Sequence, residues 1–250
     1  MMIHQYTQAV AKHYAAYRPP LHQLILRRAL LGMERFADGL DVGCGTGRSS
    51  VALAEFCRHV SAIDPSQSML DAAISHDAIT YMQGSGESIP LPDNSIDIVT
   101  FAGSLFYVDA DAGVREINRI CRSDALIVPY DFEILIGDIL RRFGLEMYAQ
   151  QSTYNHCANL STFPDFTEVL VERDRIELDV LATDLAHVLL ADAARHDAFT
   201  RRYNTSDPFE RLVADLDSTN ERIVVRADIF YSTYRLAGFP GKGIEGRQAR

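Results

Sequence analysis

A glycine-rich stretch near the start of the chain, GLDVGCGTGRSS at residues 39–50, contains the residues best suited to hold a ligand. Gly43, Gly45 and Gly47 occupy alternate positions between an apolar run and a run with helical character. Glycine adopts positive φ and lets a ligand approach the backbone closely. A strand, a glycine turn and a helix in this order are typical of a nucleotide site over the end of the strand.

Several classes of nucleotide site share this arrangement, and the details separate them. A Walker loop is excluded because no Gly-Lys-Ser/Thr follows the glycines. The dinucleotide pattern G-x-G-x-x-G is half met, since Arg48 stands where the third glycine belongs. Asp41, just before the loop, would repel a pyrophosphate but attract a cation. The loop therefore favours a ligand with an ammonium or sulfonium group, with an NAD(P)-dependent oxidoreductase as the alternative.

A second acidic residue, Asp64, ends the next apolar run. A carboxylate at this position accepts hydrogen bonds from both ribose hydroxyls in nucleoside sites, and NAD sites share this feature. Pro65 suits the first position of a helix, so Asp64 also suits a helix N-cap. Asp64 is thus predicted to bind ribose, and it does not by itself identify the nucleotide.

A third stretch, GSGESIPLPDNSIDIV at residues 84–99, separates the alternatives. Together with LDVGCGTG and Asp64, it resembles the class I methyltransferases that use S-adenosylmethionine (SAM), of the type 11 or 25 kind. In many small-molecule members the third motif reads roughly G-D-A-E-x-L-P-F-x-D-x-S-F-D-x-V. The resemblance covers about residues 35–135, with the motifs in the family's order and spacing. It implies SAM as the cofactor and no metal.

The resemblance also implies which residues contact SAM. The glycine loop would lie under the methionine and ribose, with Asp41 near the amino group and Asp64 on the ribose hydroxyls. Ser85 and Gly86 would lie against the adenine, where the family often has Asp and Ala. The full implied set is Asp41, Gly43, Cys44, Gly45, Gly47, Asp64, Pro65, Met69, Ser85, Gly86, Glu87 and Gly103.

The methyl acceptor would lie beyond the end of the fourth predicted strand. Phe106 and Tyr107 stand where the family often has His-Trp, and an aromatic wall attracts a sulfonium. HYAAYRPP at residues 13–20 is similar to a Tyr-x-x-Tyr-Arg-Pro segment that folds over the cofactor in related enzymes. Tyr14, Tyr17 and Arg18 would then cap SAM or the acceptor; the alternative is a helix whose tyrosines pack on the sheet.

No general base can be assigned from the sequence. Tyr107, Tyr14 and Asp131, at the end of the fifth predicted strand, are candidates for a catalytic role. The histidines of the region that follows are further candidates, although each single histidine suits the core or the surface equally well. These histidines are His156, His187 and His196.

Short apolar runs alternate with amphipathic runs through the first part of the chain, which predicts a doubly wound, mostly parallel α/β sheet. The predicted strands are residues 39–42, 59–64, 78–84, 95–103, 125–130, 175–182 and 221–236. The predicted helices are residues 5–17, 20–36, 48–57, 66–75, 111–122, 133–144, 183–203 and 207–218.

This pattern predicts one seven-stranded methyltransferase domain with an antiparallel last strand and helical additions. Its expected parts are an N-terminal helical lid at 1–36, a SAM-binding core at 37–144, a helical acceptor-side region at 145–220 containing the strand at 175–182, the final strand at 221–236 and a flexible tail at 240–250.

Composition excludes several classes of function. The net charge of −10 disfavours nucleic acid. The sequence has no apolar run long enough for a transmembrane helix, and its first residues lack the apolar centre of a secretion signal. The four cysteines form neither a zinc pattern nor a disulfide framework, which predicts reduced thiols in the cytoplasm.

The sequence therefore predicts an enzyme that transfers a methyl group from SAM to a small-molecule acceptor by in-line displacement, releasing S-adenosylhomocysteine. Two alternatives stay open: the nicotinamide oxidoreductase, and a non-catalytic methyltransferase-like protein that binds SAM or acts as a partner subunit. The acceptor, the methylated atom and the oligomeric state cannot be read from the residues.

Overall fold

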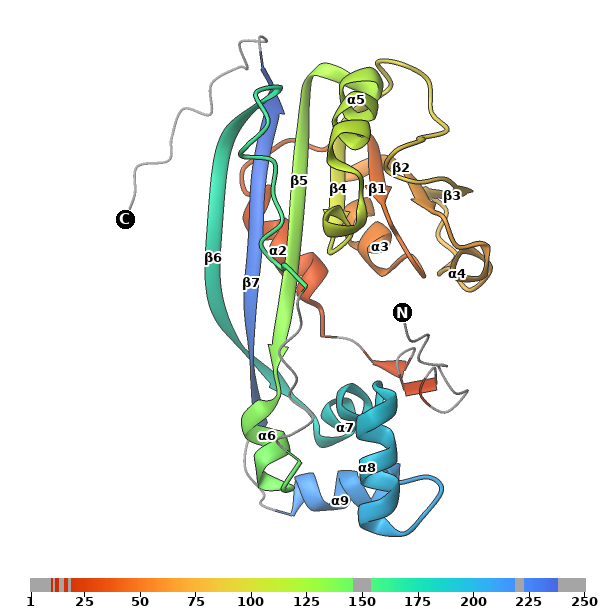
Figure 1. Ribbon diagram of the computed structural model, residues 1–250, viewed down its shortest axis with the longest axis vertical. Coiled ribbons are helices and arrows are strands. Elements are labelled where there is room, and N and C mark those ends of the chain that lie inside the picture. Colours follow the sequence, from red (N-terminus) through yellow and green to blue (C-terminus); the bar gives the residue numbers. More distant parts are fainter. Residues whose placement is uncertain are drawn as a thin grey trace. The chain divides into compact units, whose positions relative to one another are not determined.

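The chain divides into two compact units in the computed structural model (Figure 1). The sheet unit comprises Leu21–Phe132, Tyr154–Asp174 and Ile229–Arg250. The helical unit comprises Met1–Pro20, Glu133–Thr153 and Arg175–Asp228. The single-domain organisation expected from the sequence stays a prediction. The structure describes Val10, Lys12, His13, Ala16, Tyr17 and residues 19–145, 154–218 and 223–237.

A seven-stranded sheet has the order β3-β2-β1-β4-β5-β7-β6. Strands β1 to β5 pair in parallel, and β7 runs antiparallel to its neighbours (Figure 1). The doubly wound, mostly parallel sheet predicted from the sequence is therefore confirmed. The strands are β1 (Phe36–Val42), β2 (Cys57–Asp64), β3 (Ile79–Gln83), β4 (Ile96–Ala102), β5 (Cys121–Leu135), β6 (Phe166–Val180) and β7 (Ile223–Leu236).

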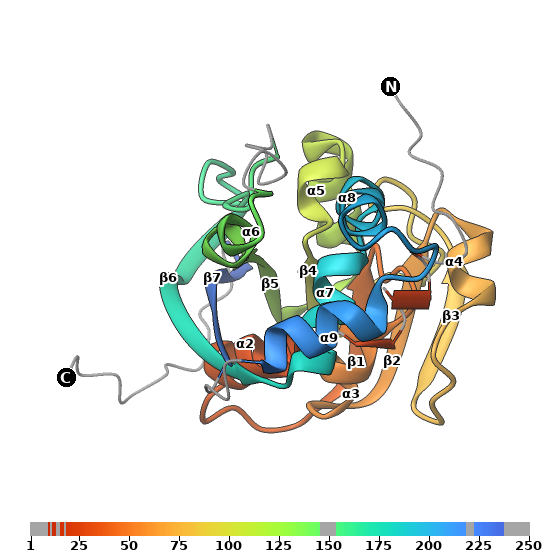
Figure 2. The same ribbon diagram turned by 90° about the horizontal axis from the view of Figure 1, so that it is seen from below.

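Within the sheet unit, α5 covers one face of the sheet while α2 and α3 cover the other (Figures 1 and 2). The Asp109 side chain caps α5 by accepting the Ala112 N–H at 2.9 Å, which satisfies one orphan donor of the first turn. The described helices are α2 (Leu21–Ala29), α3 (Arg48–Ala54), α4 (Gln67–Asp71), the 3-10 helix η1 (Leu105–Tyr107), α5 (Ala110–Ile120), α6 (Gly137–Arg142), α7 (Ala182–Leu190), α8 (Ala193–Tyr203) and α9 (Phe209–Asp217).

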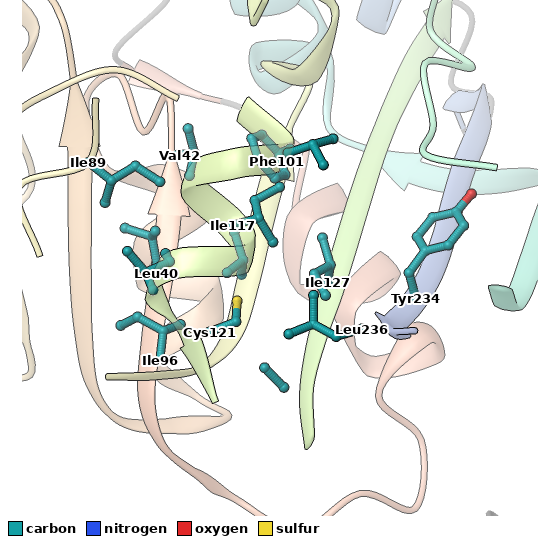
Figure 3. Packing of buried hydrophobic residues seen from close by; sticks show 14 of the residues in the cluster. Leu40, Val42, Ile89, Ile96, Phe101, Ile117, Cys121, Ile127, Tyr234 and Leu236 are labelled. Carbon is teal, nitrogen blue, oxygen red and sulfur yellow. The ribbon is translucent and has the colours of Figure 1, made fainter. Parts of the chain in front are cut away.

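One buried apolar cluster of the sheet unit lies under α5. Figure 3 shows Ile117 of α5 beside Leu40 of β1 and Phe101 of β4, and all three side chains belong to one buried cluster. In the sheet, Leu40 pairs with Val99 on one side and with Ser61 on the other. This packing positions β1 and β4, and the site lies at the carboxyl ends of these strands.

The helical unit has its own apolar cluster, to which α7, α8 and α9 contribute (Figure 2). Leu185, Leu189, Phe199 and Leu212 are each at most 1% exposed. None of the helices in the described part of the chain is both long enough and apolar enough to span a membrane.

Strand β5 is longer than its apolar run predicts. The sequence predicts a helix over 133–144, but the strand continues to Leu135 and α6 begins only at Gly137. Over residues 131–134 the charged Asp131 and Glu133 alternate with apolar Phe132 and Ile134, the two-residue period of a strand.

The first half of β6 is absent from the predicted elements. The structure extends the strand expected at 175–182 back to Phe166 and ends it at Val180, because Ala182 begins α7. Residues between Phe166 and Ile176 are mostly exposed, so they lack the apolar face that identifies a strand. β6 is an edge strand, and an edge tolerates such charge.

Several predicted helices are wrong in extent: the helix expected over 66–75 is α4 at Gln67–Asp71, and the one expected over 48–57 ends at Ala54. The helix expected over 183–203 is two helices, because the Asp192 side chain accepts the Arg195 N–H at 3.0 Å and starts α8 anew. The helix expected over 20–36 ends at Ala29, before Gly32 with φ 79°. The helix expected at 5–17 lies largely outside the described residues.

We predict that Leu40→Ala lowers the free energy of unfolding by about 2–5 kcal/mol, because it leaves a cavity at a fully buried position of β1. Leu31→Ala is the matched control, since Leu31 is 73% exposed and its truncation should cost less than about 0.5 kcal/mol. Denaturant titration measures both, and equal costs would contradict this account of the core.

Candidate functional site

The carboxyl ends of the five parallel strands meet at one edge of the sheet. The chain order reverses between β1 and β4, since β2 and β3 lie on one side and β5 on the other. Ligands of such sheets bind outside the strand ends at this switch point. The structure brings the predicted residues together there: Gly43–Gly47 follow β1, Pro65 and Met69 follow β2, Ser85–Glu87 follow β3, and Gly103, Phe106 and Tyr107 follow β4.

The glycine loop is packed tightly at both ends and open in the middle. Gly43 has φ 72°, and a Cβ built there lies 2.5 Å from the Cβ of Ser104 in the loop after β4. Gly47 has φ 84°, and a Cβ there overlaps the hydroxyl of Tyr81. A Cβ on Gly45 meets no atom within 4 Å. The loop thus holds β1 against β4 and leaves space over Gly45.

Cys44 lies in this loop but is not a nucleophile. Its side chain is 5% exposed, and burial raises the pKa of the thiol to about 12. Thiolates rather than thiols react, so Cys44 stays inert near neutral pH.

Asp41 is fully buried at the end of β1. Its Oδ2 accepts the hydroxyls of Ser49 and Ser50, each at 2.6 Å, and its Oδ1 accepts the hydroxyl of Thr100 at 3.1 Å. Burial raises the pKa of Asp41, and the three hydroxyl donors oppose that rise. Both oxygens of Asp41 thus have hydroxyl partners within the protein, and its place near the ligand's amino group stays a prediction.

Asp64 connects the loops after β1 and β2. Its Oδ2 accepts the N–H of Gly45 and its Oδ1 accepts the N–H of Ser66, both at 2.9 Å. A carboxylate has about four acceptor sites, so two remain for other donors. Asp64 is 9% exposed, and Met69 of the following α4 is 44% exposed at the same strand end. The predicted ribose and adenine contacts of these residues stay predictions.

The third motif forms a compact turn after β3. Ser85 and Ser88 exchange backbone hydrogen bonds, and a Cβ on Gly86 would lie 2.7 Å from Val108 in the loop after β4. Glu87 accepts the N–H of Asp109 at 2.8 Å. Burial opposes ionisation of Glu87, but hydrogen bonds from Ser85 and Asp109 outweigh it and lower its pKa. Glu87 therefore joins the turn to the start of α5.

Phe106 and Tyr107 lie in η1 and are 44% and 74% exposed. The ring of Tyr154 packs against both, with centroid distances of 4.8 Å to Phe106 and 5.6 Å to Tyr107. The Tyr154 hydroxyl donates to the carbonyl of Gly103 at 2.5 Å. Sequence reasoning missed Tyr154, because it follows a stretch without a motif. The expected aromatic wall is thus a cluster of three rings.

A cavity of about 330 Å³ opens beside these rings, between η1, α5 and residues 155–163. Its volume is that of a site for a small organic molecule. Its walls are mostly apolar, with a few amide and hydroxyl groups. The lining includes Phe101, Leu105, Phe106, Val108, Val114, Ile117, Leu160 and Phe163, with Asn155, Asn159 and Thr162 as polar groups.

Asp131 and His156, two residues that the sequence presented separately, contact each other directly. The Nδ1 atom of His156 lies 2.8 Å from Oδ2 of Asp131. Asp131 also accepts the N–H of Phe132 at 2.7 Å, which holds its carboxylate at the edge of β5. The pair adjoins the end of β4, since a Cβ on Gly103 would lie 3.1 Å from Asp131 Oδ1.

The remaining candidates lie in the helical unit or outside the described residues. Tyr14 and Arg18 fall outside the described part of the chain. Tyr17 packs against the apolar cluster of the helical unit, and its capping role stays a prediction. His187 and His196 gather around buried His13, whose Nδ1 lies 2.9 Å from Nδ1 of His187. Ring packing within the helical unit thus explains the positions of His187 and His196.

No group of three or more His, Cys, Asp or Glu side chains in the described residues is arranged to hold a metal ion.

The hydroxyl partners of Asp41 were absent from the sequence prediction. Ser49 and Ser50 could have been predicted as partners of Asp41, because two serines at the start of a helix follow a strand that has an acidic residue near its end. The third donor, Thr100, comes from β4, and no local pattern connects it with Asp41.

Comparison with known proteins defines the class. Residues 40–128 match the family described as a methyltransferase domain. A solved structure from Anaeromyxobacter dehalogenans, provisionally assigned as a type II methyltransferase, shares the fold with a TM-score of 0.63 and 24% identity over 88% of this chain and 97% of that one. The seven-stranded sheet thus has the Rossmann-like methyltransferase fold.

Curated relatives match parts of the chain that are up to half of its length. A demethylmenaquinone methyltransferase of Clavibacter sepedonicus is 32% identical over 114 residues, covering 44% of this chain and 46% of the relative. A malonyl-[acyl-carrier protein] O-methyltransferase of Serratia marcescens is 34% identical over 120 residues, covering 46% of each. An uncharacterised methyltransferase of Mycobacterium tuberculosis is 38% identical over 86 residues, covering 33% and 35%. The chain thus spans about a third to a half of the length of these relatives.

We predict that Asp41→Ala lowers the free energy of unfolding by about 3 kcal/mol or more, because three buried hydroxyls lose their acceptor. Asp77→Ala, at an exposed position, is the control and should change stability by less than about 0.5 kcal/mol. Chemical denaturation measures both. A neutral Asp41→Ala would refute the role of this carboxylate as acceptor of the three hydroxyls.

The histidine cluster predicts a pH dependence of stability. Burial first, and then neighbouring His187 and His196, lower the pKa of His13 from 6.5 to about 4. The unfolded chain therefore binds the proton more tightly between these values, so the free energy of unfolding falls as the pH drops from about 6.5 to 4. His13→Phe should flatten this slope in denaturant titrations at several pH values, while His76→Gln should keep it. An unchanged slope in His13→Phe would count against the cluster.

Proposed function

We propose that the chain transfers a methyl group from SAM to a small-molecule acceptor. The observation that carries the proposal is the meeting of the glycine loop, Asp64 and the third motif at the β1/β4 switch point, within the segment that matches the methyltransferase domain family. When bound, SAM supplies a methyl group already activated on a sulfonium.

The residues present fit this cofactor. Space over Gly45 admits a ligand onto the loop backbone, and Asp64 retains acceptor sites for ribose hydroxyls. The exposed side chain of Met69 offers an apolar surface at the adjacent strand end. Asp41 contributes by holding the loop.

The chain's own residues then have three tasks. The loops after β1, β2 and β3 bind and orient the nucleoside. The rings of Phe106, Tyr107 and Tyr154 exclude water beside the strand ends and favour a cation near them. The remaining task is to align an acceptor with the sulfur–methyl bond, and most of the rate would come from this proximity.

A small acceptor is supported by charge and by volume. The net charge of −10 opposes a nucleic acid substrate, and the cavity of about 330 Å³ suits a small organic molecule. The chain's four cysteines are all free thiols, which supports a reducing compartment such as the cytoplasm.

Isothermal titration calorimetry with SAM and S-adenosylhomocysteine tests the proposal. We expect both to bind, and NAD(P)H not to bind. Asp64→Ala should weaken S-adenosylhomocysteine binding by about tenfold or more, because a carboxylate that accepts ribose hydroxyls is lost. Asp77→Ala, exposed and outside the strand ends, is the matched control and should bind like the wild type.

Asp64→Asn separates binding from folding, because it keeps the shape of the side chain while reducing its acceptor strength. Thermal unfolding of each variant without ligand reports whether the loop is intact. The proposal would be wrong if neither SAM nor S-adenosylhomocysteine bound to the wild type at millimolar concentration. Wild-type affinity in Asp64→Ala would remove Asp64 from the site.

A further inference from the structure

We infer that Asp131 and His156 form the general base of this site, and that the acceptor is a hydroxyl compound, an alcohol or a phenol. The inference rests on the proposed methyl transfer and goes beyond it by naming the base and the acceptor group. It is carried by the 2.8 Å contact between the two side chains and by their place beside the end of β4.

A continuous series of contacts leads from the glycine loop to this pair. A Cβ on Gly43 would lie 2.5 Å from the Cβ of Ser104, and Ser104 follows Gly103 directly. A Cβ on Gly103 would lie 3.1 Å from Asp131 Oδ1, and the Gly103 N–H donates to the Tyr130 carbonyl at 2.8 Å. The pair therefore lies one strand beyond the switch point, on the β5 side of the end of β4.

The contact with Asp131 determines which ring nitrogen of His156 can accept a proton. A carboxylate accepts hydrogen bonds and does not donate them, so Nδ1 of His156 carries the proton toward Asp131. The other ring nitrogen, Nε2, then keeps its lone pair in the neutral imidazole. This is the arrangement of a base oriented by a carboxylate, and Nε2 is the atom that takes the proton.

Neighbouring rings hold His156 in place. Its ring lies 4.7 Å from that of Tyr154 in an edge-to-face contact and 6.0 Å from that of Phe230 of β7 in a stacked one. Tyr154 is fixed in turn by its hydrogen bond to the Gly103 carbonyl. His156 is thus tied through Tyr154 to the same strand end that Asp131 adjoins.

Other titratable groups around His156 are less suited to the role. Burial raises the pKa of Tyr130 and of Tyr154, and nearby Asp131 raises the pKa of Tyr154 further, so both phenols stay protonated. The remaining groups share one pocket with His156: Cys157 of its own segment, Glu172 and Arg173 of β6, and Tyr231 of β7. His156 has the geometry of an oriented base, because its Nδ1 lies 2.8 Å from a carboxylate oxygen of Asp131.

A base in this position selects the chemistry of the acceptor. A thioether or an unprotonated amine already carries a lone pair for attack, and a carboxylic acid is ionised near neutral pH. A hydroxyl oxygen is a poor nucleophile until its proton is removed, so it gains most from a base. In the transfer, the acceptor oxygen forms a bond to the methyl carbon as the carbon–sulfur bond breaks. The electron pair of the broken carbon–sulfur bond stays on sulfur, and the hydroxyl proton of the acceptor moves to Nε2 of His156.

The experiment has two stages, so that the failure of methyl transfer and the failure of the base are distinguishable. First, S-adenosylhomocysteine is titrated calorimetrically into the wild type, His156→Ala, Asp131→Asn and a control, His59→Gln, in the amino-terminal half of β2. All four should bind within about twofold of one another. A wild type that does not bind overturns the proposed function itself.

Second, SAM labelled with tritium in its methyl group is incubated with the wild type and a small-molecule extract of the source organism, and the labelled product is identified. The methylated atom should be a hydroxyl oxygen. With that acceptor, His156→Ala should lower kcat by about 10²–10⁴-fold with little change in KM, and Asp131→Asn should lower it less. His59→Gln should keep wild-type turnover.

A pH profile separates a base from a merely structural residue. The His156→Ala rate should rise with hydroxide concentration where the wild-type rate is level, and added imidazole should partly restore it. His156→Gln and thermal unfolding show whether any loss comes from misfolding. Three results would each overturn the inference: a methylated atom other than a hydroxyl oxygen, an unchanged pH profile in a folded His156→Ala, or a wild type that binds S-adenosylhomocysteine but methylates nothing in the extract.

Discussion

One buried carboxylate holds both ends of the glycine loop, and the rest of the site depends on it. Asp41 precedes the loop, and Ser49 and Ser50, which follow it, donate to Oδ2 of Asp41 at 2.6 Å. Thr100 of β4 donates to the other oxygen. The same group therefore closes the loop and ties β1 to the strand across the switch point. A buried carboxylate is costly unless its hydrogen bonds are satisfied, so the loop, the helix start and β4 must form together.

At the ends of β4 and β5, side chains from segments distant in the sequence hold the site together. Tyr154 and His156 reach the strand ends from a segment with no regular secondary structure, and they attach to Gly103 and Asp131 by hydrogen bonds. The side of the candidate site at β1, β2 and β3 is thus built from strand ends and tight turns, whereas the side at β4 and β5 depends on a few side-chain contacts. Such an arrangement lets one sheet serve different acceptors by changing the attached segment.

The central sheet and its switch point could be predicted from the sequence, because buried parallel strands are short, nearly continuous apolar runs, as in β4. The first half of β6 could not, since an exposed edge strand has no apolar face to detect. Among the site residues, the glycines and Asp64 follow strand ends in local patterns. The hydrogen bonding of Asp41 involves Thr100 of another strand, and the pairing of Asp131 with His156 joins residues 25 positions apart. Contacts of this kind are set by packing rather than by local spacing.

The edge strand β6 has a consequence for how the molecule meets its own copies. It ends the sheet order, and its residues between Phe166 and Ile176 are mostly exposed and rich in charge. Adding another strand to this edge would bury Glu172 and Arg173 beside like residues of the incoming chain, at a cost in desolvation. The exposed charged residues that make β6 hard to predict from the sequence thus also disfavour the addition of further strands at this edge of the sheet.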